Sequence, residues 1–491
     1  MAKKPNIVFF GIDTLRRDRM SLYGYKRLTT PHIDNFLRNG SVFNQCFSAS
    51  IPTTSGYANM LTGHDCFGTD IVALRHQGTY APDVKTLPEI LSGEGYTTVC
   101  VGFKGNPASR GFDKYVEFTG WGSWSDGRSP KAENLNKAAI PELHRLASQK
   151  KPFMLFLRHM DPHAPYLPPA PFERMFYSGD EYDRNNHSLD APYAFKPFCD
   201  FFRSWFPPGC TDAEYIKAQY DGEIAYMDSC IEILLNEIKT LGLQDDTLVV
   251  FVSDHGETHD LHDCYFDHHG IYECTLNVPL AFHLPGRVPE GKRFNDLVRL
   301  EDVTPTILDI LGIKTGIKFE GRSLFGRMKG GDLEQRPEMY ITECTWMRKH
   351  GWRTPQYKLI LALEPDFHFK PPVELYDLVK DPDELRNIAG ENPDIVKLLT
   401  ARLKAHVAKR ESETGRKNPM FTNLQWHGFK DRGPFKTSEE AYNTMHIGDV
   451  EAARKLQAAL AEKEKLAKDE KSSAKTKPAA NAKPVKEKSG A

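Results

Sequence analysis

Short apolar runs alternate along the chain with longer stretches in which apolar residues recur every three or four positions. The runs are rich in Val, Ile and Phe and cover residues 7–12, 97–103, 153–157, 248–252 and 280–284. Runs this short and apolar on both faces are typical of strands in a parallel sheet covered by helices. The stretch 212–241 instead has helical spacing, with Tyr220 and Ile224 on one face. The pattern predicts an α/β fold with a mostly parallel sheet sandwiched by helices.

The pattern changes near residue 339. Three short strands separated by polar turns, MYITE, YKLILALE and ELYDL, precede a helical stretch over residues 393–410. This order predicts a smaller antiparallel sheet with one helix packed on it. We therefore expect four parts: a main α/β domain over 1–335, a small α+β subdomain over 336–411, an irregular extension over 412–450 and a Lys/Ala-rich tail over 451–491. The extension is of the kind that wraps over the body or a partner.

Charge bears mainly on what the chain binds. Over 491 residues, 64 basic side chains nearly balance 66 acidic ones, which argues against nucleic acid as the main partner. The tail over 451–491 has ten lysines and one arginine against six acidic residues, a net charge of +5. Such a composition predicts a solvated, disordered segment, with weak binding to nucleic acid or an anionic surface as the alternative.

Composition also bears on location. The chain is 40% hydrophobic and has no apolar run of about 18 residues, so we expect no membrane span. The start, MAKKPNIVFFGIDTL, lacks both the apolar core and the cleavage site of a secretory signal. Nine cysteines without CxxC spacing fit reduced thiols. These features predict a cytoplasmic protein.

Two predicted strands end in residues that bind metal ions. Asp13 follows the run 7–12, and Asp254 and His255 come just after the run 248–252. The carboxyl ends of parallel strands form one edge of a sheet, where ligands bind. Carboxylates combined with an imidazole suit Mn²⁺ or Zn²⁺, with Ca²⁺ or Mg²⁺ as alternatives. Capping of the following turns is the other interpretation of these residues.

A cluster of hydroxyl side chains, SIPTTSGY over residues 50–57, precedes a predicted helix start. The free N–H groups and the dipole of a helix N-terminus favour an anion there. A threonine hydroxyl becomes a usable nucleophile when a neighbour such as a bound metal lowers its pKa. A helix cap with spare hydroxyls is the alternative interpretation.

Histidine is concentrated in two segments. RHMDPHAPY begins at the end of the run 153–157, and five of the 18 histidines fall between residues 254 and 269. Surface histidines rarely crowd in this way, so we interpret the segments as parts of a functional site. Lys104, just after the run 97–103, is a further candidate contact for an anion, although a lysine at a strand end is usually only exposed.

A series of segments resembles the sulfatases in order along the chain. It consists of PNIVFFGIDTLRRDRMSLYGY, TPHIDNF, MLTG, HMDPHAPYLPP, VVFVSDHGE, DHHGIYE, NVPLAFHLPG and ELYDLVKDPDELRNIA. The resemblance covers residues 5–405. It implies the alkaline phosphatase superfamily, whose sulfatase branch has a large α/β domain and a small C-terminal sheet domain.

The resemblance breaks down at the nucleophile. The sulfatase nucleophile, a cysteine or serine converted to formylglycine, falls on Thr53. Ser55 stands in place of the proline of that motif, and Tyr57 in place of its arginine. Threonine is not a substrate for formylglycine formation. Thr14 also replaces the second of the paired N-terminal aspartates of the family.

Threonine nucleophiles occur elsewhere in the superfamily, in nucleotide pyrophosphatase/phosphodiesterases and in phosphoglycerol and phosphoethanolamine transferases. These enzymes bind metal through carboxylates, the threonine and an Asp-His pair. The corresponding set here is Asp13, Thr53, Asp254 and His255. The histidine-rich loop also resembles phosphonate monoester hydrolases, which keep the formylglycine cysteine. Thr54 is the rival of Thr53 as nucleophile.

The resemblance therefore implies a metal-dependent hydrolase of phosphodiesters or phosphonate monoesters, in which metal-bound Thr53 attacks phosphorus and water then hydrolyses the phospho-threonine. His163 and His268 would contact the anion or act as general acid. The expected substrate contacts are Lys104, His269 and Tyr57. A second metal held by His163 and His268 is an alternative.

Three other functions stay open. One is an atypical, formylglycine-independent sulfatase, one is a phospho-group transferase, and one is a binding protein without catalysis. The retained metal ligands disfavour the last, because a degraded site would lose them too. Each enzymatic alternative has a small-molecule anionic ester as its substrate. Members of the family often self-associate, so a homo-oligomer is a further expectation.

Overall fold

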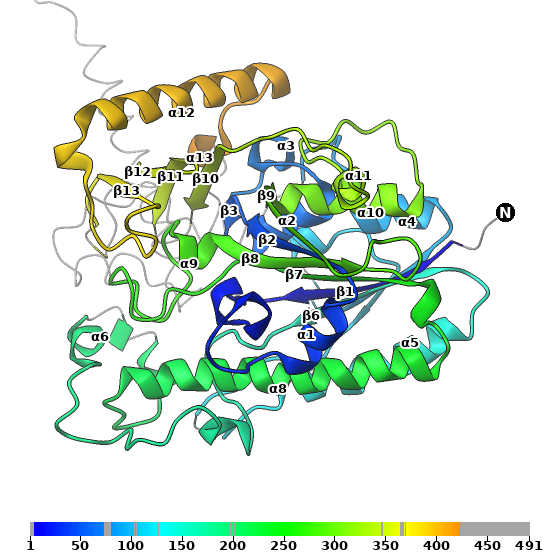
Figure 1. The fold of residues 1–491 in the computed structure, drawn as a ribbon, viewed down its shortest axis with the longest axis horizontal. Coiled ribbons are helices and arrows are strands. Elements are labelled where there is room, and N and C mark those ends of the chain that lie inside the picture. The colour runs from blue at the N-terminus through cyan, green and yellow to red at the C-terminus, as the bar shows by residue number, and fades with distance from the viewer. Residues whose placement is uncertain are drawn as a thin grey trace, which may run out of the picture.

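An eight-stranded sheet with helices on both faces forms the centre of the fold (Figure 1). The structure, a computed structural model, describes residues 4–422 except 73–79, 103, 105, 125–126, 196–197, 200–201, 345–346, 364–367 and 369. The predicted tail over 451–491 and most of the predicted extension over 412–450 therefore lie outside the described residues. Within the described part, no helix has the length and apolar composition to span a membrane.

The central sheet, sheet A, has the strand order β5-β4-β6-β1-β7-β8-β2-β9. Its strands are β1 (Asn6–Ile12), β2 (Ser41–Phe47), β4 (Thr97–Val101), β5 (Lys114–Val116), β6 (Phe153–His159), β7 (Thr247–Ser253), β8 (Asn277–His283) and β9 (Lys292–Arg299). All neighbouring pairs except those of β8 are parallel, which confirms the prediction of a mostly parallel sheet. The prediction of a parallel strand over 280–284 is wrong, since β8 is antiparallel to both neighbours. Burial on both faces makes it as apolar as a parallel strand.

Each face of sheet A has its own hydrophobic core. Along β1, Ile7 and Phe9 point into one core and Val8 and Phe10 into the other. The first core is closed by α2 (Thr53–Thr62), α4 (Leu87–Gly93), α10 (Val303–Leu311) and α11 (Phe325–Met328), and the second by α1 (Pro31–Leu37), α5 (Lys131–Ala147) and α8 (Ala213–Thr240) (Figure 1). The predicted helix over 212–241 is confirmed as α8, and the Asp212 side chain caps it by accepting a hydrogen bond from the amide of Glu214.

A second, smaller sheet, sheet B, has the order β13-β12-β11-β10-β3 and is mostly antiparallel. Its strands are β3 (Ser50–Ile51), β10 (Met339–Cys344), β11 (Arg348–Arg353), β12 (Tyr357–Ala362) and β13 (Val373–Asp377). The predicted helix is α12 (Pro393–Thr414), which packs Leu399 and Leu403 on one face of this sheet. Strand β3 belongs to the N-terminal segment and pairs in parallel with β10. The predicted domain boundary near 336 remains a prediction.

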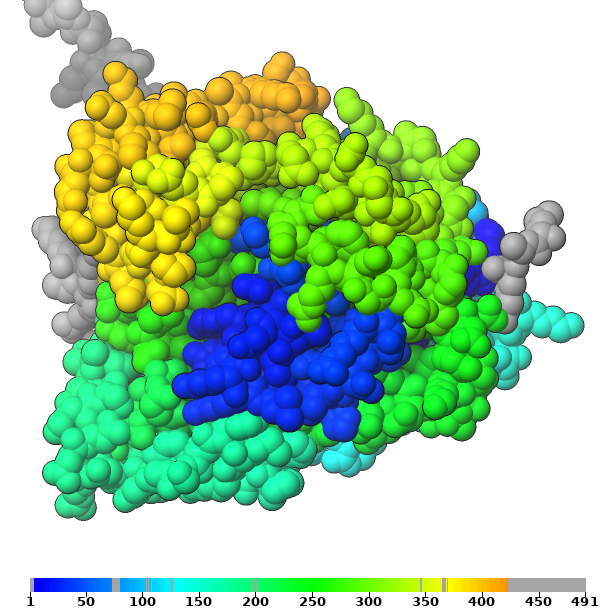
Figure 2. Space-filling model, viewed as in Figure 1, coloured from blue at the N-terminus to red at the C-terminus, as the bar shows by residue number. Residues whose placement is uncertain are grey.

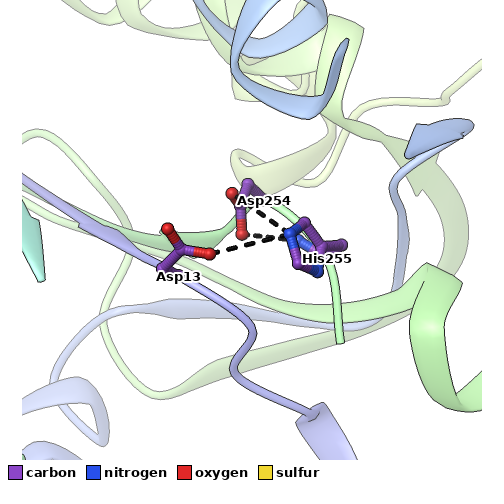
Figure 3. A group of neighbouring side chains, drawn as sticks. All are labelled: Asp13, Asp254 and His255. Carbon is purple, nitrogen blue, oxygen red and sulfur yellow. Dashed lines mark hydrogen bonds and ion pairs between the residues drawn. The ribbon is translucent and has the colours of Figure 1, made fainter. Parts of the chain in front are cut away.

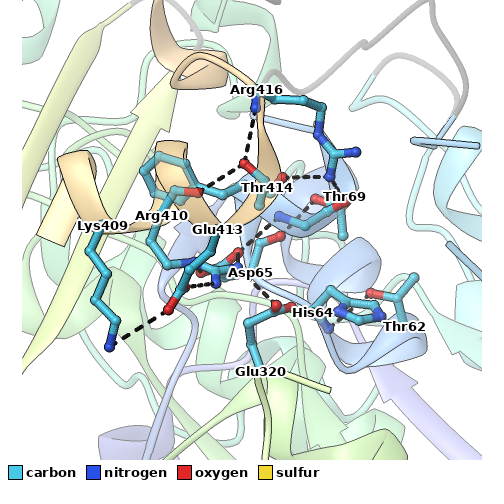
Figure 4. A network of polar contacts seen from close by, with 12 residues as sticks. Thr62, His64, Asp65, Thr69, Glu320, Lys409, Arg410, Glu413, Thr414 and Arg416 are labelled. Carbon is cyan, nitrogen blue, oxygen red and sulfur yellow. Dashed lines mark hydrogen bonds and ion pairs between the residues drawn. The ribbon is translucent and has the colours of Figure 1, made fainter. Parts of the chain in front are cut away.

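Ion pairs fix α12 against the segment that follows α2 (Figure 4). Arg410 lies 2.9 Å from Asp65 and 2.8 Å from Glu320. Asp65 in turn caps the short helix α3 (Cys66–Thr69) by accepting from the amide of Gly68. The other short helices are α6 (Asp190–Ala194), α9 (Glu273–Leu276) and α13 (Pro419–Thr422). On the face in Figure 2, segments from the middle of the chain (green) surround the N-terminal segment (blue) that follows β1.

Helix α2 approaches the end of β7 so closely that only glycine fits at the contact. A Cβ atom on Gly56 would lie 2.6 Å from the backbone oxygen of Asp254. We expect Gly56→Ala to lower the free energy of unfolding by about 1–3 kcal/mol, because the helix must move away from the strand. Denaturant titration measures this loss.

Gly93→Ala is the matched control, since no atom lies within 4 Å of a Cβ atom there. Alanine at that helical position should leave the stability unchanged or raise it. A Gly56→Ala protein as stable as the wild type would contradict the close contact.

Candidate active site

Asp13, Asp254 and His255 converge at the carboxyl ends of β1 and β7 (Figure 3). The register pairs Ile12 with Ser253, so the two aspartates stand at equivalent positions on neighbouring strands. Nε2 of His255 lies 3.6 Å from Oδ1 of Asp13 and 3.6 Å from Oδ2 of Asp254. None of the three side chains is exposed. We call these three residues the trio.

The donor atoms of the trio fit a divalent cation. Oδ1 of Asp254 accepts from the amides of Thr14 at 3.2 Å and His255 at 2.8 Å. Oδ1 of Asp13 and Oδ2 of Asp254 are buried with no hydrogen-bond partner among the described residues. Ligand atoms that each lie about 2.1 Å from one cation are about 3–3.5 Å from each other. The two 3.6 Å separations from Nε2 of His255 to the carboxylate oxygens are close to this range. Elsewhere in the described chain, no three His, Cys, Asp or Glu side chains come as close together.

The protonation states of His255 and Asp13 also suit a cation. Nδ1 of His255 donates to the carbonyl of Gly256 at 2.9 Å, and burial lowers the pKa of His255 to about 3. The ring is therefore neutral, and Nε2 presents its lone pair to the carboxylates. Burial raises the pKa of Asp254 well above its usual value, and the negative charge of Asp13 adds to this effect. Burial by itself would raise the pKa of Asp13, but the positive charge of Arg158 helps to bring this pKa below its usual value.

Thr53 is the hydroxyl that the structure brings to the trio. It is the first residue of α2, and its Oγ1 lies 3.1 Å from Nε2 of His255. Thr54 is oriented differently, because its Oγ1 accepts a hydrogen bond from the side-chain amide of Asn106 at 3.2 Å. Pro52 precedes the helix and gives it no side-chain cap, and the N-terminus of a helix favours an anion.

Two of the predicted histidines border the trio. The ring of His268 lies 4.8 Å from that of His255 and 5.5 Å from that of His163. Burial lowers the pKa of His163 to about 4, and Nδ1 of this ring faces the carbonyl of Ala164 at 2.7 Å, which leaves Nε2 unprotonated. His269 instead lies beside His368, with 3.4 Å between ring nitrogens. The second metal stays a prediction.

A buried lysine holds the turn that carries His163. Nζ of Lys131 donates to the carbonyl of His163 at 2.8 Å and lies 2.9 Å from Glu223 and 3.4 Å from Asp161. The lysine and both acids are buried. Removing one partner of such a group leaves uncompensated charge, so the pairing fixes this turn firmly. The sequence analysis missed Lys131, which lies in α5 without a distinctive motif.

The other two predicted substrate contacts, Tyr57 and Lys104, differ sharply in exposure. Tyr57 is fully buried, with its ring against Phe156 and its phenol close enough to Arg158 for the two groups to interact electrostatically. Its side chain has no exposed surface for a substrate to touch. The Lys104 side chain is 64% exposed and lies 3.7 Å from Glu117, at the rim of a cleft beside the trio.

Arg158 begins the RHMDPHAPY segment that the sequence assigned to the site, but its own role was not predicted. Its guanidinium forms an ion pair with Oδ2 of Asp13. Arg158 comes directly after the predicted strand 153–157, and neighbouring parallel strands bring such positions together. Its position in the sequence therefore pointed to the site, but not to a pairing with Asp13.

Comparisons with known proteins identify the family. The sequence pattern of the family described as Sulfatase matches residues 5–313. The chain belongs to the sulfatase family. A second pattern, described as N-sulphoglucosamine sulphohydrolase, C-terminal, matches residues 262–413, which include most of sheet B. The resemblance drawn from the sequence is confirmed, and the chain is a sulfatase-like ester hydrolase.

Individual relatives agree with this family. The chain is 24% identical over 479 residues to N-acetylglucosamine-6-O-sulfatase of Bacteroides thetaiotaomicron, covering 79% of this chain and 83% of the relative. The fold resembles that of phosphonate monoester hydrolase of Agrobacterium radiobacter, with a TM-score of 0.67 at 20% identity, over 83% of this chain and 96% of that one. It also resembles a protein solved with its substrate D-glucosamine-2-N,6-O-disulfate, with a TM-score of 0.65 at 21% identity, over 85% and 100% of the chains. These likenesses confirm the alkaline-phosphatase-like fold.

Metal binding by the trio has a thermal signature. Adding Mn²⁺ or Zn²⁺ to metal-free protein should stabilise it by about 2.7 kcal/mol at about 100 times the Kd. Asp254→Asn should lose most of this gain. In the metal-free state the same variant should unfold at the wild-type temperature or above it, because one of two adjacent buried negative charges is gone.

Thermal unfolding with and without each metal measures both effects. Asp245→Asn, at an exposed position just before β7 and so at the opposite end of that strand from the trio, is the charge-matched control and should respond to metal as the wild type does. An undiminished metal response in Asp254→Asn would refute the ligand assignment.

Proposed function

We propose that this chain hydrolyses a small anionic sulfate ester with unmodified Thr53 as the nucleophile. The observation that carries the proposal is the 3.1 Å contact between Thr53 Oγ1 and His255 Nε2, beside two buried carboxylates. Family membership supports the reaction class, and the similarity to an N-acetylglucosamine-6-O-sulfatase supports a sulfate ester. Thr53 stands where the family has its modified nucleophile, so the formylglycine route is closed to this chain.

The residues around Thr53 are arranged to activate its hydroxyl. Because Nδ1 of His255 donates to Gly256, the single lone pair of Nε2 can accept a hydrogen bond from Thr53, and in the metal-bound site a cation would take this lone pair instead. A divalent cation held by Asp13, Asp254, His255 and Thr53 would supply Lewis-acid chemistry, lowering the pKa of the hydroxyl and offsetting charge on the ester. The position at the start of α2 adds first-turn amides that favour an anion.

The leaving alcohol needs a proton, and two imidazoles are positioned for it. Nε2 of His163 and the ring of His268 border the trio. Burial makes both rings neutral by lowering their pKa values. The negative charge of a bound ester opposes that shift and favours protonation of one ring, which can then act as general acid. Thr53 Oγ1 forms a bond to sulfur as the S–O bond to the alcohol breaks; the alcohol takes the proton of the imidazole, and the Thr53 proton passes to solvent water. A sulfo-threonine is left, which water hydrolyses.

The ranking of substrates differs from the one drawn from the sequence. That ranking placed phosphodiesters and phosphonate monoesters first, and the comparisons do not confirm it. They favour the sulfate ester, which was the alternative. Phosphonate monoester or phosphodiester hydrolysis remains the second candidate, because Thr53 is unmodified and the trio contains the Asp-His pair of phosphoryl-transferring relatives. The phospho-group transferase differs from it only in the acceptor.

Turnover of matched aryl esters tests the proposal. The panel is a sulfate, a phosphate diester, a phosphonate monoester and a phosphate monoester, assayed after reloading with Mn²⁺ or Zn²⁺. We expect the sulfate to be cleaved fastest. Thr53→Ala should lose about a thousandfold or more in kcat while it keeps its fold and metal, as expected for a lost nucleophile.

Thr54→Ala is the matched control, since it removes the neighbouring hydroxyl without touching His255. It should keep most of the activity. A larger loss in Thr54→Ala than in Thr53→Ala would move the nucleophile by one residue. A dominant diester or phosphonate rate would replace the sulfate proposal with the second candidate.

A further inference from the structure

A cleft of about 370 Å³ opens beside the trio. Its lining includes Lys104, Asn106, Glu117, Phe118, Trp121, Arg158 and Met160. Three of these contact the site directly. Arg158 pairs with Asp13, Asn106 donates to Thr54, and the ring of Trp121 lies 5.2 Å from that of His163. The cleft is therefore continuous with the place where the ester bond would break.

The walls of the cleft suit a ring. Trp121 is 57% exposed, which is high for so large an apolar side chain, and Phe118 and Met160 line the cleft with it. An indole face open to solvent is a stacking surface for a planar or sugar ring. The volume is at the small end of the range for pockets that hold one organic ligand.

The charges of the cleft favour an anion on that ring. Two cations, Lys104 and Arg158, line it against one carboxylate, Glu117. Arg158 already pairs with Asp13, whereas among the described residues the exposed Lys104 has one ion pair, with Glu117 at 3.7 Å. An arginine fork can bind a carboxylate or sulfate while it keeps another contact. A neutral leaving group would leave this positive charge without a partner on the ligand.

We propose that the cleft binds the organic part of the ester and that Lys104 and Arg158 select a ring carrying a second negative charge. The substrate class is then a dianionic ester, with the scissile sulfate at Thr53 and a carboxylate or second sulfate on the ring. This inference rests on the proposed function, because the cleft holds a leaving group only if the ester is cleaved at Thr53. Glu117 acts against it, since it competes for Lys104.

The test compares para-nitrophenyl sulfate with its meta-carboxylated counterpart. The quantity measured is kcat/KM for the carboxylated ester divided by kcat/KM for para-nitrophenyl sulfate. Because the intrinsic reactivities of the two esters are the same for every variant, a change in this ratio reports a change in the enzyme. Lys104→Gln should lower this ratio about threefold to fivefold, which is the effect expected from the loss of one exposed charge pair. Glu117→Gln should raise it, because Lys104 is released. If the two residues had only structural roles, the two substitutions would not change the ratio in opposite directions.

Lys137→Gln is the control, because Lys137 forms a similar exposed pair with Glu133 on α5, at 2.8 Å. It should leave the ratio unchanged. Equal ratios in the wild type and in Lys104→Gln, or a fall in Glu117→Gln, would overturn the proposal.

A binding measurement separates failure of this inference from failure of the proposed function. Calorimetry with the two product phenols needs no turnover. The wild type should bind the carboxylated phenol more tightly than para-nitrophenol, and Lys104→Gln should lose that preference. If neither ester turns over and the preference is present, the proposed function fails and the cleft assignment stands. If the preference is absent, the cleft assignment fails whatever the turnover.

Discussion

The site depends on two carboxylates, those of Asp13 and Asp254, held side by side without any exposed surface. Like charges in a buried site repel each other, and the protein relieves this only in part. Arg158 compensates one oxygen of Asp13, and backbone amides satisfy one oxygen of Asp254. One oxygen of each carboxylate faces the neutral His255. A divalent cation at that point would turn a costly arrangement into a stable one.

The fold explains why such a pair can be built at all. Parallel pairing of β1 and β7 in register puts two strand ends at one edge, and the two cores fix that edge from both faces. Gly56 lets α2 approach closely enough to place Thr53 beside His255. Sheet B helps to position Thr53 indirectly, because its strand β3 leads into α2 and pairs with β10. Segments from both ends of the chain thus position one hydroxyl.

Much of this was predictable from the sequence, for physical reasons. Strand ends in a parallel sheet converge, so Asp13 and Asp254 could be expected to meet. The polar strand RKHGWR of β11 has no apolar pattern, and β3 is too short for one, so neither was predicted. The exposed Trp121 and the burial of Tyr57 depend on tertiary packing, which spacing alone does not define. The cytoplasmic location and the homo-oligomer remain predictions.

The central claim is that Thr53 itself forms the covalent intermediate. Mass spectrometry of acid-quenched enzyme mixed with the aryl sulfate tests it most directly. The account predicts that the peptide containing Thr53 is unmodified before the reaction and gains the mass of one sulfuryl group during turnover, on Thr53. Thr53→Ala should show no such adduct. An adduct on another residue, or steady turnover without any adduct under conditions that trap intermediates, would contradict the account.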